Sequence, residues 1–189
     1  MNHKASYLRY PIVLLLGIIL LFSNTVLGQS PSIVVPPESQ GVPKGGTAYL
    51  SVTVAGALPI TYTWHRNFES TNYYQATLDS TNCTLTLPDM MPSNACFFNL
   101  DTHNSFGNGP GKQVVVAVIS SGMATNGFVL TIQGLTNSVW TINCSTNLSP
   151  SNWFTLTNFG IPANPPVFTF VDLEATNLNR FYQVIPKVN

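Results

Sequence analysis

Residues 45–66 read GGTAYLSVTVAGALPITYTWHR, and this stretch decides the fold. Apolar and polar side chains alternate strictly through Leu50, Ser51, Val52, Thr53 and Val54. Successive side chains of a strand point to opposite faces, so this pattern predicts one face on a core and the other in water. The Gly56–Pro59 turn then leads into a second expected strand, which carries Trp64.

The rest of the chain after Gly28 repeats this rhythm, and no long segment shows a helical period. Short β-branched and aromatic runs alternate with Pro, Gly and Asn clusters, which is typical of antiparallel strands. In residues 29–119 the expected strands are Ser32–Pro36, Thr47–Ala55, Ile60–Arg66, Cys83–Leu87, Phe97–His103 and Lys112–Ile119. In residues 120–189 they are Phe128–Gln133, Val139–Asn143, Trp153–Asn158, Val167–Asp172 and Phe181–Ile185. We expect two β domains, with a hinge at Ser120-Ser121-Gly122.

Residues 1–28 have the layout of a signal peptide. Lys4 and Arg9 precede the apolar run Pro11–Phe22, and small residues lead to an expected cleavage between Gly28 and Gln29. The alternative is an uncleaved anchor, but a membrane span takes about 20 apolar residues and this run is shorter. Both interpretations place the remaining chain outside the cytoplasm, secreted or at the cell surface. Membrane contact is expected only if the segment is not cleaved.

The charge of the chain excludes several classes of partner. Seven basic and seven acidic residues balance, and loss of Lys4 and Arg9 leaves five against seven. Such a weak field predicts no binding to nucleic acid or to an anionic membrane surface. Charged residues make up only 7% of the chain, so Asn, Thr and Ser must supply the polar surface.

The spacing of the residues around Trp64 resembles that of a known protein family. Trp64 follows Val52 by about a dozen residues, and Leu85-x-Leu87-x-x-Met90 precedes the run Asn94 to Leu100. Together these positions resemble the I-set immunoglobulin domain, in which such a tryptophan packs between two sheets. The resemblance covers roughly residues 31–119 and implies an all-β chain: an immunoglobulin-like β-sandwich followed by a second small antiparallel β domain.

The departures from that pattern concern its disulfide. Val52 and Leu100 stand where the family has its two cysteines, and Phe98 replaces the corner tyrosine. A bridge closing about 48 residues would contribute roughly 4 kcal/mol, so burial of Val52, Trp64 and Leu100 must offset its loss. Disulfide-free versions resemble modules of secreted bacterial proteins that end in Asn-x-Phe-Gly, which is Asn104–Gly107 here. The block from Cys144 to Val184 resembles a β-rich C-terminal module of such proteins, and this implies architecture rather than chemistry.

The three cysteines, Cys83, Cys96 and Cys144, allow at most one intrachain pair. Cys83 and Cys96 begin antiparallel strands, so about four residues of strand, roughly 15 Å, separate them. That distance exceeds disulfide reach, and we expect Cys83 to be buried as a small apolar group.

The candidate polar site is His65 with Asp101 and His103. If Trp64 and Leu100 point inward, these three side chains share the opposite, exposed face of neighbouring strands. A metal or a base–carboxylate pair is one interpretation. Three solvated side chains is the expected one, because a metal needs further ligands. Asp101-x-His103-x-Ser105 resembles a hydrolase triad, but neighbours about 6–7 Å apart along a strand lie beyond hydrogen-bond reach. We therefore predict no catalytic residue, metal or cofactor.

Aromatic residues suggest a second kind of site. Phe68, Tyr73 and Tyr74 lie in a polar stretch between strands, where rings either stack on sugars or pack at a sheet edge. The expected function is a non-catalytic adhesion or ligand-binding module, with a carbohydrate-binding accessory protein as the alternative. The partner is then an extracellular protein or glycan of unknown identity. Trp153 and Tyr182 are expected in strands and in the core, and Asp172 and Glu174 in solvent.

Overall fold

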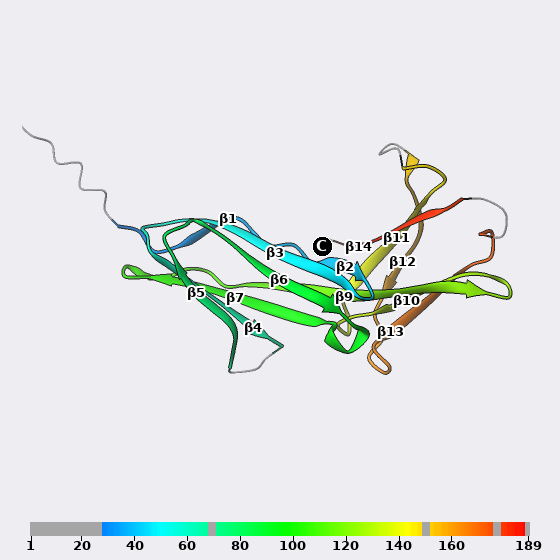
Figure 1. The fold of residues 1–189 in the computed structure, drawn as a ribbon, viewed down its shortest axis with the longest axis horizontal. Helices are drawn as coiled ribbons and strands as arrows, with labels where there is room; N and C mark the ends of the chain where they lie inside the picture. The colour runs from blue at the N-terminus through cyan, green and yellow to red at the C-terminus, as the bar shows by residue number, and fades with distance from the viewer. Residues whose placement is uncertain (1–27, 68–70, 149–151, 176–178, 188–189) are drawn as a thin grey trace, which may run out of the picture.

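The computed structural model describes residues 28–67, 71–148, 152–175 and 179–187. Within these ranges the chain is all-β apart from short 3-10 turns, among them Pro92–Asn94. Two β units lie one after the other along the long axis of the molecule (Figure 1). The predicted fold class is confirmed. The predicted signal peptide spans residues 1–28, and residues 1–27 lie outside the described ranges.

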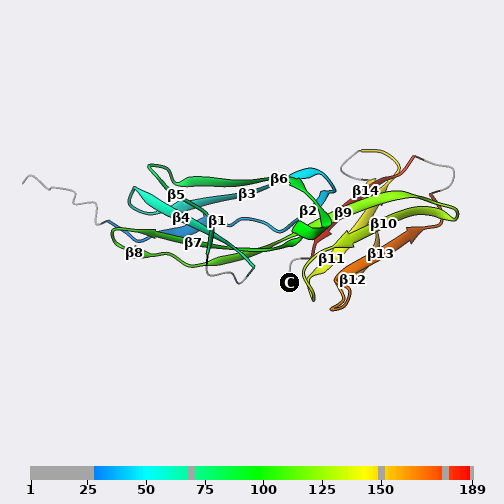
Figure 2. The ribbon, with the colours of Figure 1, turned by 60° about the horizontal axis from the view of Figure 1, so that its bottom comes forward.

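The first unit is a sandwich of two sheets (Figure 2). One sheet has the order β1-β3-β6, formed by Ser32–Val35, Gly46–Ala55 and Asn82–Met90. The facing sheet has the order β9-β7-β4-β5, formed by Lys112–Ala124, Cys96–Asn104, Ile60–Arg66 and Asn72–Leu78. Two short strands complete it: β2 (Gln40–Pro43) runs parallel to β9, and β8 (Gly107–Asn108) pairs with β7. This is the arrangement of an immunoglobulin-like sandwich.

The core of the first unit is built as the alternation in β3 predicts. Leu50, Val52 and Val54 are buried, whereas Ser51 is exposed. Trp64 and Leu100 are fully buried, lie directly opposite each other on β4 and β7, and share one core cluster with Val52. Apolar packing thus occupies the centre of the sandwich, at the two positions where the I-set pattern has cysteines.

Tyr62 adds a buried phenol to this core. Its side chain is fully buried and its hydroxyl donates a hydrogen bond to the Ser80 carbonyl oxygen at 2.9 Å. Burial is the main cause that raises the pKa of Tyr62 to about 12. In the unfolded chain a tyrosine has a pKa of about 10.

This difference predicts an alkaline loss of stability. The folded-state pKa lies above the unfolded one, so the contribution of Tyr62 is complete below pH 10 and is lost as pH rises toward 12. A difference of about two in pKa between the folded and unfolded states corresponds to about 3 kcal/mol of unfolding free energy. Urea titrations at several pH values above 9 should show this fall, and Tyr62→Phe should make it shallower. Equal slopes in the two proteins would contradict the assignment.

The expected hinge at residues 120–122 is wrong, because these residues continue β9. Alternate residues of β9 enter two different cores. Val114, Val116 and Val118 belong to the first core cluster, and Ala117 belongs to the second. Residues 114–119 are all apolar because both faces of this strand pack against a core. The two units are therefore joined through a shared strand that lies within both cores.

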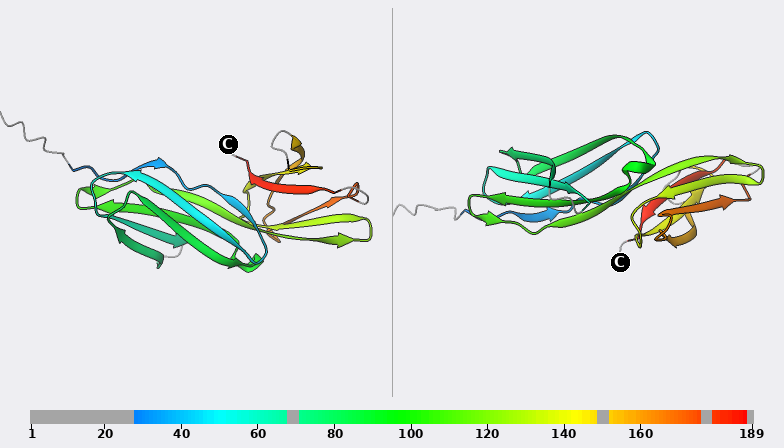
Figure 3. Two further views of the ribbon diagram at one scale, coloured as in Figure 1. Left: turned by 45° about the horizontal axis from the view of Figure 1, so that its top comes forward. Right: turned by 90° about the horizontal axis from the view of Figure 1, so that it is seen from below.

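The second unit also packs two sheets together (Figure 3). β10 (Gly127–Gln133) and β13 (Val167–Asp172) extend the sheet of β9, and the facing sheet has the order β12-β11-β14, formed by Phe154–Gly160, Val139–Ser145 and Phe181–Pro186. Trp140 and Ile142 are fully buried between them. Trp153 was expected in a strand and in the core, and this is wrong, because it precedes β12 and is only half-buried. Tyr182 does lie in a strand and packs partly buried against the core.

A buried ion network closes the far end of this unit, and it corrects the expectation that Asp172 is solvated. Asp172 is 5% exposed, and its Oδ2 accepts hydrogen bonds from Arg180 Nη1 and the Tyr182 hydroxyl, each at 2.8 Å. Arg180 Nη2 also contacts Glu174 Oε2 at 2.8 Å, while the Glu174 side chain stays 81% exposed. Burial first, and then the bond to Asp172, raises the pKa of Tyr182 above its ordinary value.

Candidate binding surfaces

The structure brings His65 and Asp101 together on the outer face of the β5-β4-β7 sheet. Strand register places Thr63 opposite Asp101 and Thr61 opposite His103, and β5 adds Gln75 and Thr77 on the same face. His65 Nε2 lies 3.3 Å from Asp101 Oδ2. We call this surface the His65 face; it consists of Thr61, Thr63, His65, Gln75, Thr77, Asp101 and His103.

Several side chains of the His65 face are paired with one another. The hydroxyls of Thr61 and Thr77 are 2.7 Å apart, and Thr61 and Thr63 are buried. β-Branched side chains have few rotamers, so a partner that binds here orders little that is not already ordered. The face offers imidazole, carboxylate and hydroxyl groups as hydrogen-bond donors and acceptors.

Ser105 does not share the strand that carries the other two residues of the triad-like motif. It lies in the turn after β7, beyond Asp101 and His103. Among the residues that the structure describes, no three His, Cys, Asp or Glu side chains are placed to hold a metal ion. In the same ranges, no helix has the length and apolar character needed to cross a bilayer.

The candidate aromatic residues lie apart from the His65 face. Tyr74 stands opposite Trp64, so it shares the core side of the sheet and projects at its edge. The Tyr73 ring meets the buried Phe98 edge-on, with centroids 5.3 Å apart and planes at 72°. Both tyrosines remain exposed, Tyr73 at 49%. Phe68, the third candidate, lies outside the described residues.

Burial dominates the chemistry of two cysteine side chains, although Arg180 Nη1 also contacts the Cys144 sulfur at 3.9 Å. Cys83, Cys96 and Cys144 are all buried, and Cys83 and Cys144 carry free thiols, as expected for Cys83. Burial is the main cause that raises the pKa of both Cys83 and Cys144. A thiol with a raised pKa is a poor nucleophile at neutral pH.

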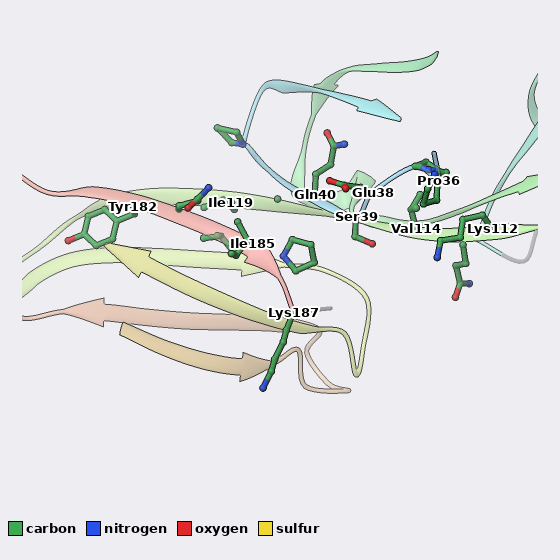
Figure 4. Close-up of a pocket in the computed structure, with 17 residues that line it drawn as sticks. Pro36, Glu38, Ser39, Gln40, Lys112, Val114, Ile119, Tyr182, Ile185 and Lys187 are labelled. Carbon is green, nitrogen blue, oxygen red and sulfur yellow. The ribbon is translucent and has the colours of Figure 1, made fainter. Parts of the chain in front are cut away.

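A groove of about 770 Å³ lies where the two units meet (Figure 4). One wall is formed by residues 36–41 and the other by residues 182–186 of β14 with Lys187 after it, and β9 contributes the apolar Val114 and Ile119. Sequence reasoning missed this surface because its walls are about 140 residues apart in the chain and meet only through the shared strand.

Comparisons with known proteins bear on the fold. No family model and no curated protein matches the chain. Among solved structures, a chimeric titin Z1Z2 carrying a decorin peptide is 20% identical, with a TM-score of 0.44, over 49% of this chain and 97% of that one. The complex of titin M10 with obscurin-like 1 matches at 20% identity and a TM-score of 0.44, over 51% and 100%. A Caenorhabditis elegans twitchin kinase fragment matches at 19% and 0.42, over 50% of this chain but 22% of that one. The strand order itself makes the first unit an immunoglobulin-like sandwich within an all-β chain.

Proposed function

We propose that this chain is a non-catalytic binding module that acts outside the cytoplasm and engages another protein through the His65 face. The observation that carries the proposal is the His65–Asp101 pair, 3.3 Å apart on the outer face of the sheet. Hydrogen-bonding groups that already pair with each other on a sheet suit recognition of a folded partner, because less side-chain entropy is lost on binding. The export layout of residues 1–28 supports an extracytoplasmic setting.

The test is a screen of the purified chain against arrayed extracellular proteins and glycans, followed by titration. His65→Ala and Asp101→Ala should each weaken binding of the partner protein by about tenfold, because each leaves the other group without its pair. Thr84→Ala is the matched control, because Thr84 is exposed on the outer face of the opposite sheet. Binding that is indifferent to both substitutions, or turnover of a generic ester or glycoside, would refute the proposal.

A second candidate is carbohydrate binding through Tyr73 and Tyr74. The edge contact with Phe98 fixes the Tyr73 ring while half of its surface stays open, which suits stacking on a sugar. The same screen separates the two functions. Glycan binding that is lost in Tyr73→Ala, kept in His65→Ala and kept in Tyr49→Ala would assign this alternative. Tyr49 is an exposed tyrosine on the opposite sheet and serves as the control.

A further inference from the structure

Gln29 is tied by its main chain to one end of the first unit. Its carbonyl oxygen accepts hydrogen bonds from the Ala57 N–H at 3.0 Å and from Asn104 Nδ2 at 2.7 Å. Asn104 Nδ2 also donates to the Ala57 carbonyl oxygen at 2.7 Å, and Asn104 Oδ1 accepts from the Phe106 N–H at 2.9 Å. One side-chain amide thus joins the end of β7, the turn between β3 and β4, and the Gln29 carbonyl group. We call this set of hydrogen bonds the Asn104 clamp.

The Asn104 clamp holds only the carbonyl end of Gln29. Among the described residues, neither the main-chain nitrogen nor the side chain of Gln29 makes a hydrogen bond, and the residue is exposed. The cleavage that the sequence predicts falls directly before this residue. Cleavage there creates an α-amine on Gln29, next to a side-chain amide that is also in solvent.

These two groups of Gln29 can react with each other. An α-amine has an ordinary pKa of about 8, so part of it is unprotonated and nucleophilic at neutral pH. The amine nitrogen attacks Cδ of the side-chain amide. The N–Cδ bond forms, the Cδ–Nε2 bond breaks, and Nε2 takes up the proton lost by the amine and leaves as ammonia. The product is a five-membered lactam, and the step needs no oxidant, reductant or cofactor.

The clamp is compatible with this ring closure. The ring consists of N, Cα, Cβ, Cγ and Cδ of Gln29, and the clamped carbonyl group lies outside it. Closing the ring therefore turns the side chain about bonds that no hydrogen bond restrains, and the contacts to Ala57 and Asn104 stay in place. The folded unit fixes the residue without protecting its reactive atoms.

We propose that Gln29 is a modification site, and that the exported chain begins with this residue cyclised to pyroglutamate and held by the Asn104 clamp. The proposal rests on the export that is part of the proposed function, because the amine exists only after cleavage. Cyclisation removes the α-ammonium charge from a chain with only five basic residues after Gly28. It also leaves no free amine at the chain end for an aminopeptidase to bind.

The test is the mass of the N-terminal peptide. The chain with residues 1–28 is expressed in a secreting host, recovered after export and kept at neutral pH. We expect the peptide to begin at residue 29, to weigh one ammonia less than a peptide with an open Gln29, and to escape an amine-labelling reagent. Gln29→Glu is the matched control. Its side chain is a carboxylate at neutral pH, which an amine does not attack, so this variant should keep a labelled amine.

A second measurement tests the clamp. A chain freshly released before residue 29 by a specific protease should cyclise at the same rate, within about twofold, when folded and in urea, because the clamp restrains no atom of the ring. Asn104→Ala should leave this rate unchanged. The same variant should speed hydrogen exchange of the Ala57 N–H, because its acceptor, the Gln29 carbonyl oxygen, is then held less firmly.

Three results would overturn the proposal. A peptide that begins at Gln29 and keeps its labelled amine would exclude cyclisation and leave export standing. A folded chain that cyclises much more slowly than the chain in urea would show that the fold protects the amine. An exported chain that begins at another residue, or keeps residues 1–28, would remove the reacting group. Protein binding through the His65 face is measured with His65→Ala, so the two proposals fail distinguishably.

Discussion

Replacing Trp64 with alanine is expected to lower the free energy of unfolding by about 3–5 kcal/mol. The side chain is fully buried between the sheets and belongs to the same core cluster as Val52 and Leu100. Its removal leaves a large cavity at the centre of a sandwich that has no disulfide there to limit the unfolded chain. Because domains of this size are stable by only about 5–15 kcal/mol, the variant should unfold at much lower urea. Far-ultraviolet circular dichroism measures the midpoint.

Two variants control this experiment. Trp64→Phe keeps an aromatic ring and leaves a smaller cavity than alanine does, so its cost should be about half that of alanine or less. Trp153→Ala removes the same side chain at a half-buried position outside the strands, and should cost about 1 kcal/mol. If Trp64→Ala were no worse than Trp153→Ala, the tryptophan-centred core would be wrong.

Arg180→Met is expected to destabilise the second unit by about 3–5 kcal/mol. The guanidinium contacts Asp172 at 2.8 Å, and both side chains are more than 90% buried. Methionine matches much of the arginine volume but leaves the Asp172 carboxylate buried without its counter-charge. Removing one partner of a buried pair costs more than the pair itself contributes, because the remaining charge is no longer compensated. Urea unfolding of the two proteins at neutral pH measures the difference.

The exposed partner of Arg180 supplies the matched control. Glu174→Gln removes an ion pair of equal length at a side chain that is 81% exposed, and its cost should stay below about 1 kcal/mol. The double variant Arg180→Met with Asp172→Leu should recover most of the lost stability, because no uncompensated charge remains. A double variant as unstable as Arg180→Met would show that packing of the arginine stem, and not burial of the carboxylate, sets the effect.

Local patterns predicted most strands of the chain. The boundaries of Ile60–Arg66 and Val167–Asp172 agree with β4 and β13, and the other predicted strands differ by a few residues at their ends. The strands that were missed share a cause. β5 is an edge strand whose residues are mostly exposed and polar, and β2 and β8 are very short, so none carries a clear apolar alternation.

The positions of the polar candidate residues were also predicted only in part. Alternation around Trp64 and Leu100 predicted that His65, Asp101 and His103 share a face, because that follows from period two and neighbouring strands. It did not predict that Asp172 is buried, since two acidic residues at a strand end look solvated until the distant Arg180 and Tyr182 are packed over one of them.

Periodicity and residue spacing were therefore enough for the fold class, the apolar centre of the first unit and the orientation of individual side chains, all of which depend on near neighbours in the chain. Assembly in three dimensions decided that residues 120–122 are strand rather than hinge, that Asp172 is compensated within the protein, and that a groove forms between β14 and residues 36–41. Each of these depends on contacts between segments far apart in the chain, and such contacts leave no local period to detect.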